Sequence, residues 1–167
     1  MNTPINVILL ERVGSAKHWN TFRRMYPKWD TELTESQRRL FATSVGPKLL
    51  PTKISQSEYN ERIKSYETDN NACVFLCLVD EDPAGYVICK KVYGYTENVW
   101  FIYELFISEK YRGHGYGKEV LVSVERYLRT HGAKYTMLRV HENNHIAKNL
   151  YTGQKYVKSA AIMYKKL

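Results

Sequence analysis

Three glycines at alternate positions mark the stretch of this sequence whose residue types are best suited to chemistry. They are Gly113, Gly115 and Gly117, and a helical pattern follows them. Glycine has no Cβ, so successive backbone N–H groups can turn toward one point, where the next helix also presents its unpaired amides. A phosphate or pyrophosphate group is the natural occupant of such a cradle. The alternative is a tight strand-to-helix turn that binds nothing, because a lone glycine pattern is weak evidence.

A single carboxylate, Glu104, lies just before these glycines in the apolar run of residues 100–107. An unpaired carboxylate in a dry core is costly, so Glu104 is expected to meet water, a cation or a substrate. Strand alternation predicts that Glu104 and Phe106 share one face, with Tyr103, Leu105 and Ile107 on the other. The alternative for Glu104 is a partly solvated position on the sheet.

The elements around these residues follow from the spacing of apolar side chains. Residues 100–107 are β-branched and aromatic, which predicts a largely buried strand. The next apolar positions fall on one face of a helix that Gly132 ends. These positions are Val120, Leu121, Val124, Tyr127 and Leu128. A further strand is expected at 135–140 and a final one at 160–167.

The N-terminal half is expected to alternate between strands and capped helices. A first strand covers 6–13, and Ser15 caps a helix that stops at Pro27. Two further helices begin at capping boxes, and two strands form a hairpin. The capping boxes are Thr34 with Gln37 and Ser55 with Glu58, and the hairpin joins 72–79 to 85–93 through a turn at 80–84.

Two motifs together resemble a known family. The apolar residues 105–107 followed by Arg112-x-x-Gly115-x-Gly117 resemble the acetyl-coenzyme A (acetyl-CoA) motif of the GCN5-related N-acetyltransferase (GNAT) superfamily. After the strand at 135–140, Asn144-x-x-Ala147-x-x-Leu150-Tyr151 is similar to the family's second motif. Two motifs in the right order are far more specific than either alone.

The resemblance implies the fold and the activity. The fold is mixed α+β, one GNAT-like domain over residues 1–167, with a twisted, mostly antiparallel sheet, flanking helices and splayed parallel central strands. The activity is transfer of an acetyl group from acetyl-CoA to a primary amine of a small molecule or peptide, and no metal is expected. The alternative is a non-catalytic acyl-CoA-binding regulatory module on the same fold.

The resemblance also implies roles for individual residues. The pyrophosphate falls to the backbone amides of residues 112–118, and a backbone N–H near Phe106 or Ile107 polarises the thioester. Tyr151 corresponds to the tyrosine that protonates the leaving thiolate, and Asn144 to the asparagine that contacts the pantetheine arm. The implied cofactor-binding residues are Phe106, Ile107, Arg112, Gly113, His114, Gly115, Tyr116, Gly117, Lys118 and Asn144.

A general base is also needed, because an amine that is protonated at neutral pH cannot attack a thioester. Glu104 is the first candidate, while His141, Glu142 or a water molecule remain alternatives. The alternative for Tyr151 is core packing by a helix aromatic. The family usually has glycine where this chain has Lys155, and Gly153 is expected to provide the left-handed C-cap of the helix instead.

Composition narrows the class of protein. The formal net charge is +8, yet no run of lysine and arginine exceeds two residues, which argues against a dedicated nucleic-acid-binding arm. Cys73 and Cys77 would stand ~13 Å apart on a strand, too far for a disulfide. With Cys89 they indicate a reducing compartment. No secretory or membrane-spanning segment is recognisable, so the expected location is the cytoplasm. The sequence leaves open whether the protein forms a homodimer.

Overall fold

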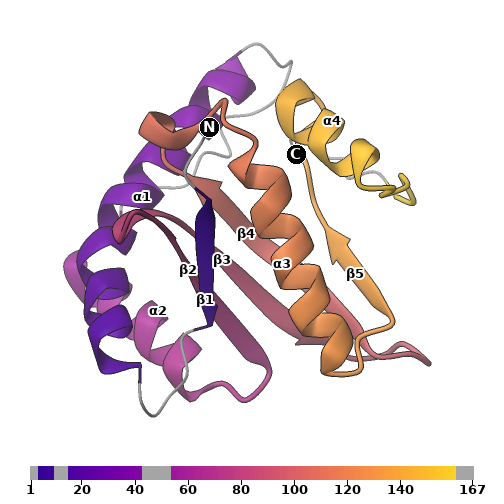
Figure 1. The fold of residues 1–167 in the computed structure, drawn as a ribbon, viewed down its shortest axis with the longest axis horizontal. Coiled ribbons are helices and arrows are strands. Elements are labelled where there is room, and N and C mark those ends of the chain that lie inside the picture. Colours follow the sequence, from indigo (N-terminus) through magenta and orange to yellow (C-terminus); the bar gives the residue numbers. More distant parts are fainter. Residues whose placement is uncertain (1–3, 10–14, 43–53, 161–167) are drawn as a thin grey trace, which may run out of the picture.

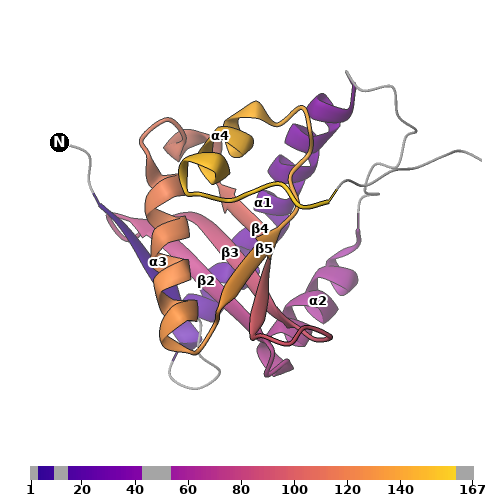
Figure 2. The same cartoon turned by 90° about the vertical axis from the view of Figure 1, so that its right-hand side faces the viewer.

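Alternating apolar side chains on the central strands give the sheet two buried faces. On β2 (Ala72–Val79), Leu76 and its even-numbered neighbours pack toward one set of helices, and Cys77 and its odd-numbered neighbours pack toward another. This is the pattern of a strand covered on both sides. The computed structural model describes residues 4–9, 15–42 and 54–160, and places helices on both faces of the sheet (Figures 1 and 2).

The sheet has five strands in chain order and is mostly antiparallel. In addition to β2, the strands are β1 (Ile5–Leu9), β3 (Asp82–Val92), β4 (Val99–Ile107) and β5 (Tyr135–Leu138). Only β4 and β5 run parallel, and their pairing ends at Ile102 opposite Leu138. Beyond Ile102, β4 continues for five residues without β5 beside it. The expected mixed α+β fold with splayed parallel strands is therefore confirmed.

The helices divide between the two faces. One face is covered by α3 (Tyr116–Thr130), and the other by α1 (Ala16–Ala42) and α2 (Gln56–Thr68). Figure 2 shows the sheet between these two layers. The short helix α4 (His145–Gly153) lies near the start of α3, and a 3₁₀ turn, η1 (Glu109–Tyr111), links β4 to that region.

The prediction that a helix ends at Pro27 is wrong. α1 continues through Pro27 to Ala42, so Thr34 and Gln37 lie inside it and form no capping box. A proline inside a helix costs about 3 kcal/mol. Burial of Tyr26 and Trp29, each worth roughly 1.5–3 kcal/mol as a large apolar group, offsets that cost.

Other element boundaries agree with the sequence or differ slightly. The Ser55–Glu58 capping box and the stop at Gly132 are confirmed. The hairpin turn is tighter than expected, because only Asp80 and Glu81 turn the chain, both with positive φ. β5 ends two residues before the expected strand does. Residues 10–13 of the first expected strand and 161–167 of the last lie outside the described residues.

A β-bulge in β4 changes which side chains share a face. Ile88 pairs with Glu104 and Cys89 with Ile102, so Tyr103 is the extra residue. Glu104 and Phe106 share one face of the sheet, as predicted, and this face meets α1 and α2. Tyr103 does not join Leu105 on the α3 face, because its ring lies 4.8 Å from that of Phe101, on the side of α2. That part of the prediction is wrong.

Candidate active site

The glycine-rich segment adopts the backbone that its sequence predicts. Gly113 and Gly115 have φ values of 81° and 85°, a region that side-chain-bearing residues rarely adopt. Gly115 is the N-cap of α3, and no side chain caps the first turn of this helix. We call residues 112–118 the anion cradle. Because the first-turn amides of a helix attract negative charge, its geometry suits a phosphate group.

The space in front of the anion cradle is open. A Cβ built on Gly113 or Gly115 would meet no heavy atom within 4 Å. Tyr116 is buried and its ring stacks on His114, whose Nδ1 lies 2.8 Å from the Arg112 carbonyl oxygen. The Tyr116 ring and the His114–Arg112 contact therefore fix the segment on its protein side. The open side has room for an anion, so the residues present fit the pyrophosphate of CoA.

α4 packs directly against the anion cradle. A Cβ on Gly117 would lie 3.4 Å from Cδ2 of Leu150, so glycine allows the close approach of the two helices. Asn144 caps α4, its Oδ1 accepting from the amide of Ala147 at 3.1 Å. This capping contact uses the Asn144 oxygen, and the predicted contact of Asn144 with a cofactor stays a prediction.

Tyr151 follows Leu150 and occupies a half-buried position. It packs against the cluster between α3 and the sheet, with its ring 5.7 Å from that of Tyr156. Burial raises the pKa of its phenol. Among residues 4–9, 15–42 and 54–160, the Tyr151 hydroxyl has no hydrogen-bond partner. The hydroxyl is therefore protonated at neutral pH.

The C-terminus of α4 differs from the prediction. Gly153 is helical, and Lys155 adopts the left-handed conformation with φ of 68°. The amide of Tyr156 donates to the Tyr151 carbonyl at 3.0 Å, and that of Lys155 donates to Thr152 at 2.9 Å. This is a Schellman motif, and its usual apolar contact is the Tyr151–Tyr156 pair. The expectation that Gly153 forms the left-handed cap is therefore wrong.

Glu104 lies on the opposite face of the sheet, against a buried tyrosine. The hydroxyl of Tyr86 donates to Glu104 Oε2 at 2.6 Å. Burial raises the pKa of the Glu104 carboxyl; the Tyr86 hydrogen bond opposes this and the Asp30 carboxylate adds to it. A carboxylate with a raised pKa suits a general base near neutral pH.

Aromatic and charged side chains from α1 and α2 surround this carboxylate. The Tyr86 ring stacks on Trp29 with centroids 5.6 Å apart and meets Tyr26 edge-on at 5.3 Å. Arg62 Nη1 donates to the Tyr26 hydroxyl at 3.4 Å and lies 3.8 Å from an oxygen of Asp30. We call Tyr26, Asp30, Arg62, Tyr86 and Glu104 the acceptor cluster.

Two further tyrosines extend the acceptor cluster. Tyr59 donates to Asp30 at 2.7 Å, and burial raises the pKa of Tyr59 to about 12. Tyr66 lies edge-on to Tyr26 with ring centroids 6.4 Å apart, and burial also raises its pKa. All these phenols are therefore neutral hydrogen-bonding groups near pH 7.

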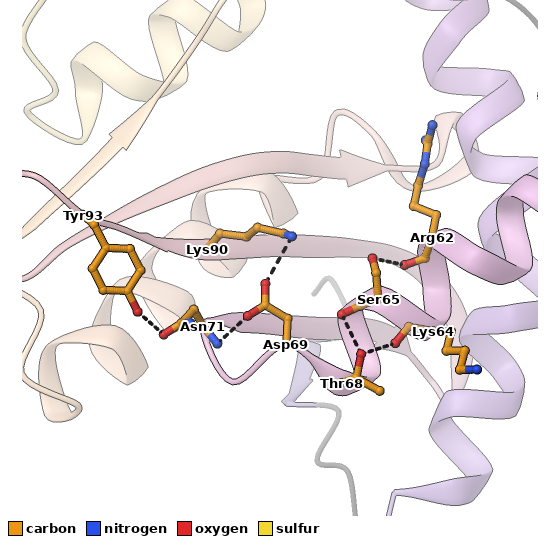
Figure 3. Close-up of polar contacts among 8 residues, drawn as sticks. All are labelled: Arg62, Lys64, Ser65, Thr68, Asp69, Asn71, Lys90 and Tyr93. Atoms are coloured by element: carbon orange, nitrogen blue, oxygen red, sulfur yellow. Dashed lines mark hydrogen bonds and ion pairs between the residues drawn. The ribbon is translucent and has the colours of Figure 1, made fainter.

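The C-terminal end of α2, about two turns after Arg62, is tied to β3. Lys90 Nζ donates to Asp69 at 3.3 Å, and Asp69 also accepts from the amide of Asn71 at 2.9 Å. Tyr93 donates to the side chain of Asn71 at 2.5 Å. Figure 3 shows these contacts, with the Arg62 side chain extending away from them. They hold α2 in place while leaving Arg62 to Tyr26 and Asp30.

The alternative bases have less suitable surroundings. Glu142 is exposed, and hydrogen bonding and charge from Lys148 lower the pKa of its carboxyl. His141 Nδ1 accepts from the amide of Asn143 at 3.2 Å. Glu104 therefore remains the better candidate.

Sequence reasoning missed most of the acceptor cluster. Asp30 lies beyond Pro27, where the predicted helix had ended, and Tyr86 had no feature to separate it from other strand aromatics. Continuation of the apolar spacing from Trp19 and Tyr26 to Trp29 and Leu33 was the available signal for the longer helix.

Two findings concern the described residues as a whole. No three histidine, cysteine, aspartate or glutamate residues within residues 4–9, 15–42 and 54–160 are grouped so that they could hold a metal ion. Within the same ranges, no helix has the length and apolar character needed to cross a membrane.

Comparison with solved structures shows where this fold occurs. An aminoglycoside acetyltransferase from an uncultured soil metagenomic sample, solved with sisomicin, has a TM-score of 0.68 at 13% identity, covering 98% of this chain and 96% of that one. Aminoglycoside N-acetyltransferase AAC(6′)-Iy in complex with CoA has a TM-score of 0.69 at 10% identity, covering 100% and 97%. At these identities the likeness concerns the fold.

Comparison of sequences gives the family. The uncharacterized N-acetyltransferase YycN of Bacillus subtilis (strain 168) is 28% identical over 104 residues, which are 62% of this chain and 67% of that protein. The model of the acetyltransferase (GNAT) family matches residues 31–155, which include the anion cradle, Glu104 and Tyr151. The chain therefore belongs to the GNAT family of N-acetyltransferases.

Proposed function

We propose that this protein transfers an acetyl group from acetyl-CoA to the primary amine of a small, positively charged molecule or peptide. The observation that carries the proposal is the Tyr86-bonded carboxylate of Glu104. It lies on β4 just beyond the point where β5 stops, and a few residues before the anion cradle. The proposed proton acceptor and the anion cradle are therefore joined by the end of β4 and the short link that follows it.

The anion cradle holds the pyrophosphate of CoA through backbone groups of residues 112–118. Acetyl-CoA, when bound, supplies the activated acyl group as a thioester. Past Ile102 the edge of β4 has no strand partner among the described residues on the β5 side. The Ser108 amide donates to Ala84, so the Phe106 amide, two residues earlier, also faces β3. Of the two predicted donors, the Ile107 amide is therefore the one proposed to polarise a carbonyl oxygen. Asn144, at the start of α4, is proposed to contact the pantetheine arm.

Glu104 acts as the general base. Because its pKa is raised, the carboxylate is a stronger proton acceptor than an ordinary glutamate. It takes a proton from the ammonium group of the substrate, directly or through water, and the resulting free amine attacks the thioester. Tyr86 fixes the carboxylate by donating to one oxygen and leaves the other oxygen for the amine.

Tyr151 acts as the general acid on the other side of the sheet. Its hydroxyl is protonated at neutral pH because burial raises its pKa, and it can protonate the departing thiolate. Glu104 faces α1 and α2, whereas Tyr151 packs toward α3. The proposed base and the proposed acid therefore lie on opposite faces of the sheet.

The acceptor cluster favours a cation. It contains two carboxylates, Glu104 and Asp30, and one guanidinium, that of Arg62. Tyrosine rings beside it favour cations through their electron-rich faces. The solved neighbours include aminoglycoside acetyltransferases, one of them with sisomicin bound, so polycationic amino sugars belong among the candidates.

An acceptor screen tests the proposal. Purified protein is mixed with acetyl-CoA and a panel of aminoglycosides, polyamines, lysine peptides and neutral or acidic amines, and free thiol is measured over time. We expect thiol release with cationic amines and little with acidic ones. Binding of acetyl-CoA without release for any amine would instead support the non-catalytic acyl-CoA-binding module.

A further inference from the structure

A carboxylate on α1 holds the segment that leads into the anion cradle. Both oxygens of Glu32 are used: Oε2 accepts from the Ser108 hydroxyl at 3.0 Å, and Oε1 accepts from the Glu109 amide at 2.7 Å and from Arg112 Nη2 at 2.9 Å. These partners lie more than 75 residues away in the chain, so the contact joins two separate elements. Three hydrogen bonds from one α1 side chain therefore tie this helix to the segment.

The same contact fixes Arg112. Its Nε donates to the Ile107 carbonyl at 2.8 Å, and its guanidinium lies 5.6 Å from the centre of the Phe106 ring. With Glu32 on one edge and Ile107 on another, the guanidinium is already neutralised and held against the protein. The Arg112 guanidinium therefore stabilises the start of the anion cradle, and the backbone amides are the groups that would bind the anion.

We propose that Glu32 is a positioning residue for CoA binding, acting through the Glu109 amide and Arg112. The left-handed backbones of Gly113 and Gly115 are intrinsically free to change, since glycine has access to many conformations. Fixing the residues immediately before them removes part of that freedom before the cofactor binds, and preorganisation of this kind increases affinity. This inference rests on the proposed function of the anion cradle.

The acceptor side should not respond to Glu32. Asp30 lies two residues earlier on α1, and its contacts are with Tyr59 and Arg62 in the acceptor cluster. Among the described residues, the hydrogen bonds of the Glu32 side chain are with Ser108, Glu109 and Arg112, on the cradle side. Loss of the Glu32 carboxylate should therefore change the KM for acetyl-CoA and leave the KM for the amine unchanged, a split that loss of α1 packing would not produce.

The test compares Glu32→Ala with wild-type protein by calorimetric titration with CoA and by steady-state kinetics. We expect the Kd for CoA and the KM for acetyl-CoA to rise about tenfold, the effect of losing a charge-assisted hydrogen-bond network. Turnover at saturating acetyl-CoA and the KM for the amine should remain within about twofold, because both depend on other residues. Glu32→Gln keeps the side-chain shape and an acceptor oxygen, and should raise Kd only about two- to threefold.

Glu35→Ala is the matched control. Glu35 lies one turn further along α1 and borders the same surface hollow of about 330 Å³, but its ion pair is with Arg38 on its own helix. We expect wild-type affinity for CoA in this variant. An unchanged Kd in Glu32→Ala, or a parallel rise in both KM values, overturns the inference. Wild-type protein that binds no CoA overturns the proposed function, and this inference with it.

Discussion

The anion cradle and the acceptor cluster are built in different ways. The cradle is one continuous segment, and its binding groups are backbone amides whose direction is set by Gly113 and Gly115. The acceptor cluster takes its side chains from two helices and two strands, and Tyr26 and Glu104 are far apart in the sequence. A segment built from backbone leaves a local pattern in the sequence, whereas a cluster built from side chains depends on the whole fold.

This difference separates what the two regions should share with other family members. An anion cradle of amides recognises a pyrophosphate whatever amine is acetylated. The acceptor cluster recognises the amine through Glu104, Asp30 and their aromatic neighbours, so it should carry specificity. Substitutions in the two regions should therefore affect different kinetic parameters.

The largest effect is expected for Glu104→Gln on activity. Glutamine keeps the size and accepts the Tyr86 hydrogen bond but cannot take a proton, so turnover at about pH 7 should fall by 10²–10⁴-fold, the usual contribution of a general base. The affinity for CoA should not change, because the cradle is elsewhere. Activity should recover at higher pH, where free amine exists without help. Full activity of the variant at neutral pH would reduce Glu104 to a structural carboxylate and remove the main distinction between the two regions.

Tyr151→Phe should give the next largest effect. Phenylalanine keeps the contact with Tyr156 and removes only the hydroxyl, so the fold should persist while turnover falls by about 10²-fold, as for loss of a general acid. The loss should be smaller for acyl donors whose leaving thiol is more acidic. Wild-type turnover in the variant would assign Tyr151 to core packing.

The sequence predicted the cradle better than the acceptor cluster, for the physical reason just described. Gly113, Gly115 and the N-terminus of α3 follow from local rules about φ and helix ends. Glu104 was visible because a carboxylate in an apolar strand is unusual. Asp30, Arg62 and Tyr86 were not found, since Pro27 hid the continuation of α1 and tertiary packing alone brings these residues together.

The bulge at Tyr103 could not be predicted from the sequence either. One extra residue in β4 reverses the alternation of faces, and nothing in the local sequence marks it. The position of Glu104 was nevertheless predicted correctly, because the alternation from Glu104 to Ile107 lies after the bulge.

Gly115→Val tests the backbone half of the comparison. The side chain would enter the open space in front of α3, so binding of acetyl-CoA and the stabilisation it brings, about 2.7 kcal/mol at 100 times its Kd, should be lost. Valine at a positive φ also strains the backbone. Gly94→Val is the matched control, because Gly94 has φ of 89° and an equally open environment in the β3–β4 connection. Thermal unfolding should show destabilisation in both variants and a lost response to acetyl-CoA only in Gly115→Val. If acetyl-CoA stabilised both variants equally, or did not stabilise wild-type protein, the assignment of residues 112–118 as the anion cradle would be contradicted.

Glu104→Gln should also change stability, in the opposite direction to its effect on activity. The folded-state pKa of Glu104 is raised, so the folded protein holds this proton more tightly than the unfolded chain does. Stability is therefore lost as pH rises from the unfolded value, ~4.3, through the raised folded value. The variant has no such ionisation and should be more stable by about 0.5–2 kcal/mol near pH 7, as for other functional residues replaced by neutral ones. The gain should vanish below about pH 4. A gain that is independent of pH, measured as the difference in Tm, would mean that ionisation of Glu104 is not its cause.

The smallest effect is expected at the end of α4, where a residue with a Cβ adopts a backbone conformation that favours glycine. Lys155 occupies the left-handed position of the Schellman motif, a conformation that costs a residue with a Cβ roughly 1 kcal/mol and costs glycine almost nothing. Lys155→Gly should therefore raise stability by about 0.5–1 kcal/mol, a Tm increase of roughly 1–4 °C, with turnover unchanged. Gly153→Ala is the informative companion. Gly153 is helical and a Cβ there would meet nothing within 4 Å, so alanine should also stabilise, by about 0.5–1 kcal/mol. If the left-handed residue were Gly153, as the sequence alone suggested, alanine there would destabilise the protein. If Lys155→Gly and Gly153→Ala changed stability in opposite directions, the left-handed cap would not lie at Lys155. The end of α4, the helix that carries Tyr151, would then have to be reassigned.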